Sequence, residues 1–347
     1  MTTCIQVNTR FLAHELTGVQ RYTTEILDRL EGQYEPISPE RWPSAGTLGH
    51  LWEQFVLPLR LDDRLFWNPT CPGPLAVSNQ VITVHDLSAL EHPEWFDWKY
   101  ALWNRVLIPP LLHRVQHIVT VSDYTQTRIQ DLFGVPRRKM TTIYNGVDGR
   151  FMPRPADEIA EMREALDLPA GPYVLSLSAL QPRKNIQRLL RAWARIQEEL
   201  QETTLVLAGG AARPTIFQSF SLDRIPPNVI FTDYVADEWL PALYSGATAF
   251  AYPSLYEGFG LPVLEAMACG TPVVTSNQTS LPEVAGGGAH LVDPHSIESI
   301  AGGVKQVLED CDYRDELRRE GRERAKSFEW ERTATETLRV LEKVQSG

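Results

Sequence analysis

Two glutamates, Glu257 and Glu265, lie eight residues apart around a glycine-containing segment. Pro262 favours a helix that begins between them, because its ring presets φ and a first-turn N–H has no helical partner; Gly270 suits the left-handed end of that helix. Such a helix has Glu265 in its first turn and Glu257 in the preceding loop, so both carboxylates are expected near its positive end. N–H groups at a helix start bind anions, and carboxylates accept hydrogen bonds from hydroxyl groups. A nucleotide sugar, with a diphosphate and vicinal hydroxyls, fits this pattern.

The residues around the glutamates carry more weight than their spacing, which also arises by chance in a glutamate-rich chain. Gly258 and Gly260 have no side chain to keep a ligand away from the backbone N–H groups. The alternative interpretation is an acidic loop that leads into an ordinary core helix.

A second candidate anion site combines two cations with a helix start. Arg183 and Lys184 directly precede Asn185, the expected cap of a helix with an apolar face over 186–196. Positive charge at a helix N-terminus opposes the macrodipole, so an anionic ligand would relieve the conflict. A solvated basic turn is the alternative.

Further candidates follow two expected strands in the first half of the chain. His85 and Asp86 end the apolar run 81–84, and open α/β sheets bind ligands at the carboxyl ends of their strands. Gly18 follows the expected strand 4–8 and opens a helix, a pattern that can hold an anion. A structural histidine and a plain tight turn are the respective alternatives.

An aromatic-rich segment spans residues 92–103 and includes Trp95 and Trp98. Its aromatic side chains are too many for one buried stripe, so some are expected to stack on an acceptor sugar or to meet a membrane interface. Core packing of a helix is the alternative. Pro109 and Pro110 are expected to break this helix.

Composition limits the classes of protein to consider. A chain of 347 residues exceeds what one core usually supports, so two domains are expected. The net charge of −11 argues against a nucleic-acid partner. Isolated cysteines, the lack of a signal-like N-terminus and the lack of a long apolar run predict a cytoplasmic protein with reduced thiols. The acidic pair around Cys311 is interpreted as surface charge, and no metal is expected.

Alternating strand and helix patterns predict an α/β protein. We expect an N-terminal domain over 1–165, a C-terminal domain over 166–328, and a last helix at 329–347. A glycine turn after the expected strand 204–208 lacks the third glycine and the acidic residue of a dinucleotide site, so NAD is not expected.

The segment from Gly258 to Pro262, together with 266–276 after it, resembles the signature of retaining glycosyltransferases of family 4. The resemblance covers nearly the whole chain, because the glycine turn, the His-Asp strand end, the Arg-Lys turn and the glutamate segment occur in the family's order. It implies the GT-B fold, with two Rossmann-like domains whose parallel sheets face each other across a cleft. In this fold the N-terminal domain would bind the acceptor, the C-terminal domain would bind the donor, and the last helix at 329–347 would cross back to the first domain.

The resemblance implies catalytic roles for four side chains. Arg183 and Lys184 would hold the donor diphosphate, Glu257 a hexose hydroxyl, and His85 would contact the sugar; Glu265 would bind the ribose hydroxyls. The other donor contacts that it implies are Gly18, Val19, Tyr234, Val235, Gly258, Phe259, Gly260 and Leu261.

The expected reaction is a retaining, metal-independent transfer of a mannose-like hexose to a saccharide or lipid-linked saccharide in polysaccharide or glycan synthesis. GDP-mannose is the first expected donor and UDP-glucose the second. Asp86, Arg21, Trp95 and Trp98 are expected near the acceptor, with peripheral contact at the inner membrane face. The rival hypotheses are a nucleotide-sugar 2-epimerase or hydrolase of the same fold, and a non-catalytic subunit that binds sugar nucleotide. The sequence carries no indication of the oligomeric state.

Overall fold

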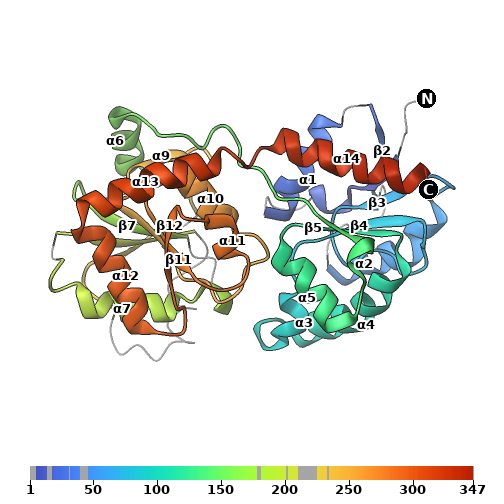
Figure 1. Cartoon of the computed structure of the whole chain (residues 1–347), viewed down its shortest axis with the longest axis horizontal. Helices are drawn as coiled ribbons and strands as arrows, with labels where there is room; N and C mark the ends of the chain where they lie inside the picture. The colour runs from blue at the N-terminus through green and yellow to red at the C-terminus, as the bar shows by residue number, and fades with distance from the viewer. Residues whose placement is uncertain are drawn as a thin grey trace. The chain divides into compact units, whose positions relative to one another are not determined.

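The computed structural model describes residues 5–13, 18–30, 32–39, 46–177, 181–200, 202–209, 225–232 and 234–346, with backbone alone at 11 and 13 (Figure 1). The chain divides into two compact units. The first unit comprises Met1–Gly146 and Phe328–Gly347, and the second comprises Val147–Ser327.

The first unit contains a six-stranded parallel sheet in the order β2-β1-β3-β4-β5-β6. Its central strand β4 is mostly apolar and fully buried, as expected of a parallel strand that is covered on both faces. The strands are β1 (Ile5–Asn8), β2 (Tyr34–Ile37), β3 (Phe66–Asn68), β4 (Gln80–Val84), β5 (His117–Thr120) and β6 (Met140–Thr142).

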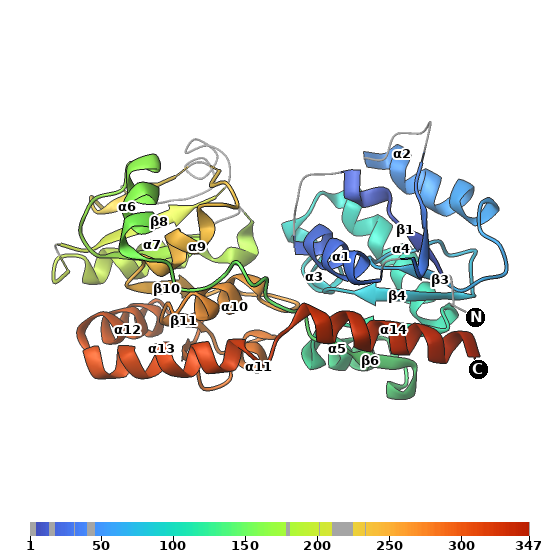
Figure 2. The ribbon, with the colours of Figure 1, turned by 90° about the horizontal axis from the view of Figure 1, so that it is seen from above.

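Helices cover both faces of this sheet, because alternate strand residues pack on different helices. Ile82 and Ile118 share a buried cluster with α4 and α5. Thr83, next to Ile82, lies 3.3 Å from the Tyr22 hydroxyl of α1, and Tyr22 contacts Trp330 of α14. Figure 2 shows α1 and α14 side by side in this unit. The helices are η1 (Arg10–Ala13), α1 (Gly18–Arg29), α2 (Gly46–Leu51), η2 (Trp52–Val56), η3 (Leu57–Leu59), α3 (Ser88–Glu91), η4 (Pro93–Trp95), α4 (Trp98–Arg114), α5 (Asp123–Phe133), η5 (Arg137–Lys139) and α14 (Trp330–Ser346).

The second unit repeats this plan with a parallel sheet in the order β12-β11-β10-β7-β8-β9. Val174 packs with α7 and α12 on one face, whereas its neighbour Tyr173 donates to the Leu243 carbonyl of α9 at 2.6 Å on the other. The strands are β7 (Tyr173–Leu177), β8 (Thr204–Ala208), β9 (Val229–Phe231), β10 (Ala249–Tyr252), β11 (Val273–Ser276) and β12 (Ala289–Val292). The helices are α6 (Ala156–Ala165), η6 (Pro182–Lys184), α7 (Ile186–Ile196), α9 (Leu240–Ser245), α10 (Leu261–Ala268), α11 (Leu281–Ala285), α12 (Ile297–Glu309) and α13 (Cys311–Ala325).

The division of the chain differs from the boundary expected at residue 165. Helix α6 belongs to the second unit, because Met162 is buried and the Arg163 guanidinium lies 4.9 Å from the centre of the Tyr173 ring. Helix α14 belongs to the first unit, where the Thr333 hydroxyl donates to the Tyr144 carbonyl at 2.7 Å.

The prediction that Pro109 and Pro110 break the helix is wrong. Helix α4 continues through both prolines to Arg114. Leu111 and Leu112, just beyond the prolines, are fully buried against β4 and β5, and this burial offsets the lost backbone hydrogen bonds. Within the described residues, no helix is long and apolar enough to cross a bilayer.

Candidate functional site

A cluster of charged side chains lies at the carboxyl edge of the second unit's sheet. Strand β10 ends at Tyr252, and Glu257 follows in the loop before α10. Arg183 and Lys184 come from η6, which follows the neighbouring strand β7. These three charged residues, predicted at separate sequence motifs, therefore meet where open α/β sheets bind ligands.

The Glu257 carboxylate is nearly saturated with hydrogen bonds. Its Oε1 accepts from Lys184 Nζ at 2.7 Å, from Tyr252 Oη at 2.9 Å and from Ser254 Oγ at 2.7 Å. Lys184 also donates to the Tyr252 hydroxyl. Oε2 accepts from Arg183 Nη1 at 3.2 Å. This network fixes the orientation of the carboxylate before any ligand arrives.

The cations next to Glu257 affect its pKa more strongly than burial does. Burial by itself raises the pKa of this carboxyl, but the nearby Lys184 and Arg183 cations, with hydrogen bonds from Lys184 and Ser254, lower the pKa to about 2. Glu257 is therefore ionised at neutral pH. Burial, and then the Glu257 charge, raise the pKa of Tyr252 well above its usual value, so this hydroxyl keeps its proton.

The two cations differ in their access to solvent. The side chain of Lys184 is 11% exposed, whereas that of Arg183 is 21% exposed and also donates through Nε to Gln181 Oε1 at 2.6 Å. With one carboxylate facing two cations, the cluster carries an excess positive charge. It can therefore attract an anionic ligand, with Arg183 as the more accessible group.

The backbone of η6 is joined directly to the loop after β10. The Arg183 carbonyl accepts from the Leu255 N–H at 2.7 Å. It also lies 2.8 Å from Ser254 Oγ, whose single proton is shared between this carbonyl and Glu257 Oε1. Asn185 occupies the cap position of α7 with φ of 58°, but its side chain makes no capping bond. Its amide instead donates to the carbonyls of Pro253 and Pro294.

The glycine segment leads into α10 as expected, with two differences. Gly260 has φ of 113° and forms the cap, so the helix begins at Leu261 and Pro262 is its second residue. Gly270 has φ of 76° and follows the helix end, as predicted. Glu265 was expected in the first turn but lies in the second, since it is the fifth residue of the helix.

Glu265 is buried, and its Oε2 accepts from the Tyr244 hydroxyl of α9 at 3.0 Å. Its charge also contributes to the raised pKa of Tyr252, after burial and Glu257. Gly258 and Phe259 are buried in the same loop. Tyr234 is 77% exposed, whereas Val235 beside it is buried.

The candidates of the first unit have separate local partners. His85 Nε2 lies 2.8 Å from the Pro69 carbonyl, which only accepts, so the proton is on Nε2 and Nδ1 has a lone pair. Burial lowers the pKa of His85. Asp86 accepts from both the backbone N–H and the hydroxyl of Ser88, at 2.9 and 2.6 Å, in the turn that precedes α3.

The other first-unit candidates lie on helices. Gly18, Val19 and Arg21 form the first turn of α1, with Gly18 exposed and the other two partly buried. Trp95 stacks on His92, with ring centres 4.0 Å apart. Trp98, the first residue of α4, is 66% exposed.

Sequence reasoning missed three residues of the second-unit cluster: Tyr252, Ser254 and Thr279. Thr279 Oγ1 accepts from the Glu257 N–H at 3.3 Å. For Tyr252 the sequence does contain a signal, because this residue lies at a strand end. Thr279 comes from the loop after β11, more than twenty residues further along the chain, and nothing in its local sequence marks the contact.

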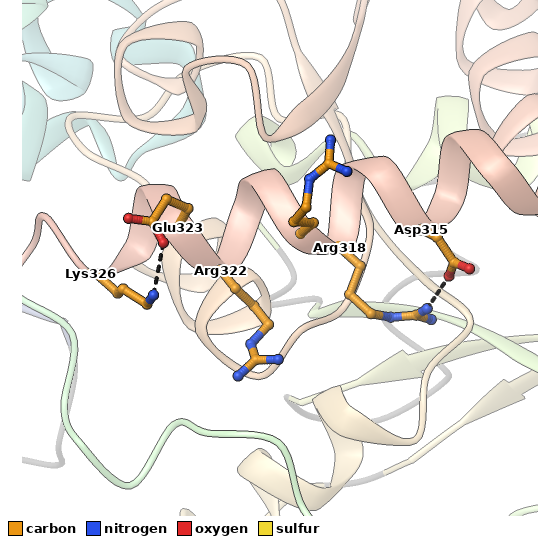
Figure 3. Close-up of a pocket in the computed structure, with 6 residues that line it drawn as sticks. Asp315, Arg318, Arg322, Glu323 and Lys326 are labelled. Atoms are coloured by element: carbon orange, nitrogen blue, oxygen red, sulfur yellow. Dashed lines mark hydrogen bonds and ion pairs between the residues drawn. The ribbon is translucent and has the colours of Figure 1, made fainter.

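Two surface hollows lie away from this cluster. One of about 520 Å³ lies along α13 and is lined by Asp315, Arg318, Arg319, Arg322, Glu323 and Lys326 (Figure 3). Arg318 Nε donates there to the Gly270 carbonyl at 3.1 Å, so α13 is hydrogen-bonded to the segment that follows α10. The other, of about 810 Å³, lies between α3, η4, α4 and α5 and includes Trp98.

Asp310, expected as surface charge, accepts from the Tyr313 N–H and caps α13.

Similarity to known proteins covers both units. The family described as Glycosyl transferases group 1 matches residues 158–324, and the family described as Glycosyltransferase Family 4 matches residues 67–150. O-antigen chain mannosyltransferase B of Escherichia coli is 34% identical over 279 residues, which are 80% of this chain and 73% of that protein. A GDP-mannose-dependent alpha-(1-6)-phosphatidylinositol monomannoside mannosyltransferase of Mycolicibacterium smegmatis is 35% identical over 249 residues, 69% of this chain and 64% of that protein.

Solved structures match over almost the full chain. Sucrose-phosphate synthase of Thermosynechococcus elongatus has a TM-score of 0.75 at 20% identity and covers 99% of both chains. HepE of Anabaena in complex with UDP and glucose has a TM-score of 0.75 at 20% identity, with 99% of this chain and 100% of that chain covered. These likenesses show the fold, which is GT-B as expected.

Proposed function

This chain belongs to glycosyltransferase family 4, and we propose that it moves a mannose-like hexose from a nucleotide sugar to a saccharide or lipid-linked saccharide acceptor. The observation that carries the proposal is the buried Glu257, paired with both Arg183 and Lys184 at the carboxyl edge of the sheet. A carboxylate held in this way is an acceptor for a sugar hydroxyl, and the adjacent excess positive charge suits a diphosphate.

GDP-mannose is the first donor that we propose. The E. coli relative is named a mannosyltransferase, and the M. smegmatis relative is named GDP-mannose-dependent. UDP-glucose comes second, because HepE, which shares the fold, binds UDP and glucose. We propose that Glu265 binds the ribose hydroxyls, with Val235 beside the base.

We propose a retaining reaction on one face of the sugar. The bond from the anomeric carbon to the diphosphate oxygen breaks, and its electron pair goes to that oxygen. The acceptor hydroxyl oxygen then bonds to the anomeric carbon from the same face, and its proton passes to the leaving diphosphate. Arg183, Lys184 and the N–H groups of the glycine loop would stabilise the charge that develops on the diphosphate.

We propose that this charge stabilisation requires no metal, since two cationic side chains already serve it. In the first unit, we propose that His85 contacts the sugar. Its neutral imidazole offers Nδ1 as an acceptor for a sugar hydroxyl, while Nε2–H stays on the Pro69 carbonyl.

For the acceptor, we propose a site on the first unit and transfer at the inner membrane face. Helix α4 exposes Trp98, Leu102 and Val106, and Lys99 lies 5.7 Å from the centre of the Trp98 ring. Tryptophan and aliphatic side chains with nearby cations suit a lipid–water interface. We also propose that Arg21 and Asp86 lie near the bound acceptor saccharide, and that Trp95 contacts the acceptor together with Trp98.

The test incubates the purified protein with GDP-mannose or UDP-glucose, with and without mannose-containing oligosaccharides and lipid-linked saccharides. We expect nucleotide release and a glycosylated product in the presence of an acceptor and with chelator. Release of nucleotide or an epimer from donor alone would point to a hydrolase or epimerase. Donor binding without turnover by any acceptor would point to a non-catalytic subunit.

A further inference from the structure

Thr279 has an unfavourable backbone conformation beside the Glu257 cluster. It lies in the loop between β11 and α11 with φ of 61°, in the left-handed region. Of the three non-glycine residues with positive φ in the described part of the chain, Thr279 is the β-branched one. Such a residue is a strong outlier there, and it keeps this conformation only where its surroundings impose it, often at ligand sites.

The surroundings that impose it are hydrogen bonds to the Glu257 loop. Thr279 Oγ1 accepts from the Glu257 N–H at 3.3 Å. Ser280 Oγ lies 2.9 Å from the Glu257 carbonyl and 2.8 Å from the Phe259 carbonyl, so its single proton is shared between them. Two consecutive side chains therefore hold the backbone of residues 257–259 at both ends.

The next residue limits movement of the same loop. Leu281 begins α11, and its Cδ2 would lie 2.7 Å from a Cβ added at Gly260. Strands β10 and β11 are parallel neighbours, so the loops that follow them meet at one edge of the sheet. If Thr279 adopted an ordinary negative φ, its hydroxyl and the backbone of the two residues that follow it would move relative to Glu257.

We propose that Thr279 is a positioning residue of the donor site, which rests on the proposed function. By holding the Glu257 N–H, it fixes the carboxylate and the following glycine N–H groups in the geometry that donor transfer requires. The backbone strain is retained because the geometry of the neighbouring loop depends on it. Small displacements of groups that contact reacting atoms lower rates steeply.

The test compares three substitutions by donor KM, kcat and melting temperature. Thr279→Val keeps the shape and the strain but removes the oxygen. This variant is expected to lower kcat/KM for the donor about tenfold, mainly through kcat, because loss of the hydrogen bond to the Glu257 N–H displaces a group that contacts the donor. Thr279→Ser keeps the oxygen and is expected to remain within about threefold of the wild type. Thr279→Gly removes both strain and oxygen, so activity is expected to fall about tenfold while the melting temperature stays within about 2 °C.

Asp167→Gly is the matched control, because Asp167 also has positive φ, of 53°, but lies at the end of α6. It is expected to leave donor kinetics unchanged. A Thr279→Val enzyme within twofold of wild-type kcat/KM would overturn the proposal, as would a Thr279→Gly enzyme whose activity falls only in proportion to lost stability. Failure of the wild type to transfer any hexose would instead overturn the proposed function, and this inference with it.

Discussion

The two units have the same layered plan, but their candidate residues are held in different ways. In the second unit, side chains from η6, β10 and the loop after β10 meet on one carboxylate. In the first unit, by contrast, His85 bonds to the Pro69 carbonyl after β3, Asp86 bonds to Ser88, and Trp95 stacks on His92. The difference indicates that the second unit holds its charged groups in one preorganised cluster, whereas the candidate residues of the first unit are held separately.

Loss of a cation of the cluster is expected to have the largest effect. Arg183→Ala and Lys184→Ala should each lower kcat at least about a hundredfold, since each removes a donor from the developing charge. Arg183→Ala is the cleaner variant, because Glu257 keeps Lys184, Tyr252 and Ser254 as partners. Full activity in a folded variant of either kind would contradict the assignment.

Removal of the Glu257 charge should also reduce stability. Glu257→Gln leaves two cations beside a neutral amide, so the free energy of unfolding at pH 7 is expected to fall by about 3 kcal/mol. Because the folded pKa is about 2, below the ordinary 4.5, the contribution is complete above pH 4.5 and is lost as pH falls toward 2. Urea unfolding at pH 7, 4 and 3 should show this loss in the wild type. An equal loss in Glu257→Gln would refute the attribution.

A smaller effect is expected in the first unit. His85→Ala should lower kcat/KM for the donor about fivefold, because loss of one hydrogen bond to a ligand costs about 1 kcal/mol. Burial lowers the pKa of His85, so the residue stays neutral at pH 7 and above. The rate ratio of wild type to variant, measured from pH 7 to 8.5, should therefore be constant. A ratio that changes across this range would mean that the imidazole titrates there.

The smallest effect is expected at the exposed aromatic residue of α4. Trp98→Ala should change the free energy of unfolding by no more than about 0.5 kcal/mol, because the side chain is 66% exposed. Donor KM should be unchanged, while KM for a lipid-linked acceptor should rise several-fold. Leu59→Ala, at an apolar side chain that is 85% exposed on η3, is the control. Equal acceptor kinetics in both variants would remove α4 from the acceptor proposal.

The sequence predicted those parts of the second-unit site that lie within short segments. Arg183 and Lys184 stand out because cations precede a helix start, and Glu257 because glycines and a proline follow it. The contacts that join these segments were not predictable in this way. Lys184 meets Glu257 across 73 positions of chain, and Thr279 meets Glu257 across 22, and no periodicity marks either contact.

Two local rules failed where tertiary packing was stronger. Prolines predicted a break in α4, but burial of the apolar side chains beyond them maintains the helix. The domain boundary expected at residue 165 placed the α6 segment in the first domain. Packing of α6 on Tyr173 and α9 instead makes it part of the second unit.

The most direct test of the donor site is calorimetric titration of the wild type and Arg183→Ala with GDP, UDP, ADP and dTDP, without added metal. The account predicts that the wild type binds one nucleotide diphosphate, with GDP first, and that Arg183→Ala binds it at least about tenfold more weakly, a loss of about 1.4 kcal/mol. Equal binding by both proteins, or no binding by the wild type, would contradict the claim that the Arg183–Lys184–Glu257 cluster holds the donor diphosphate.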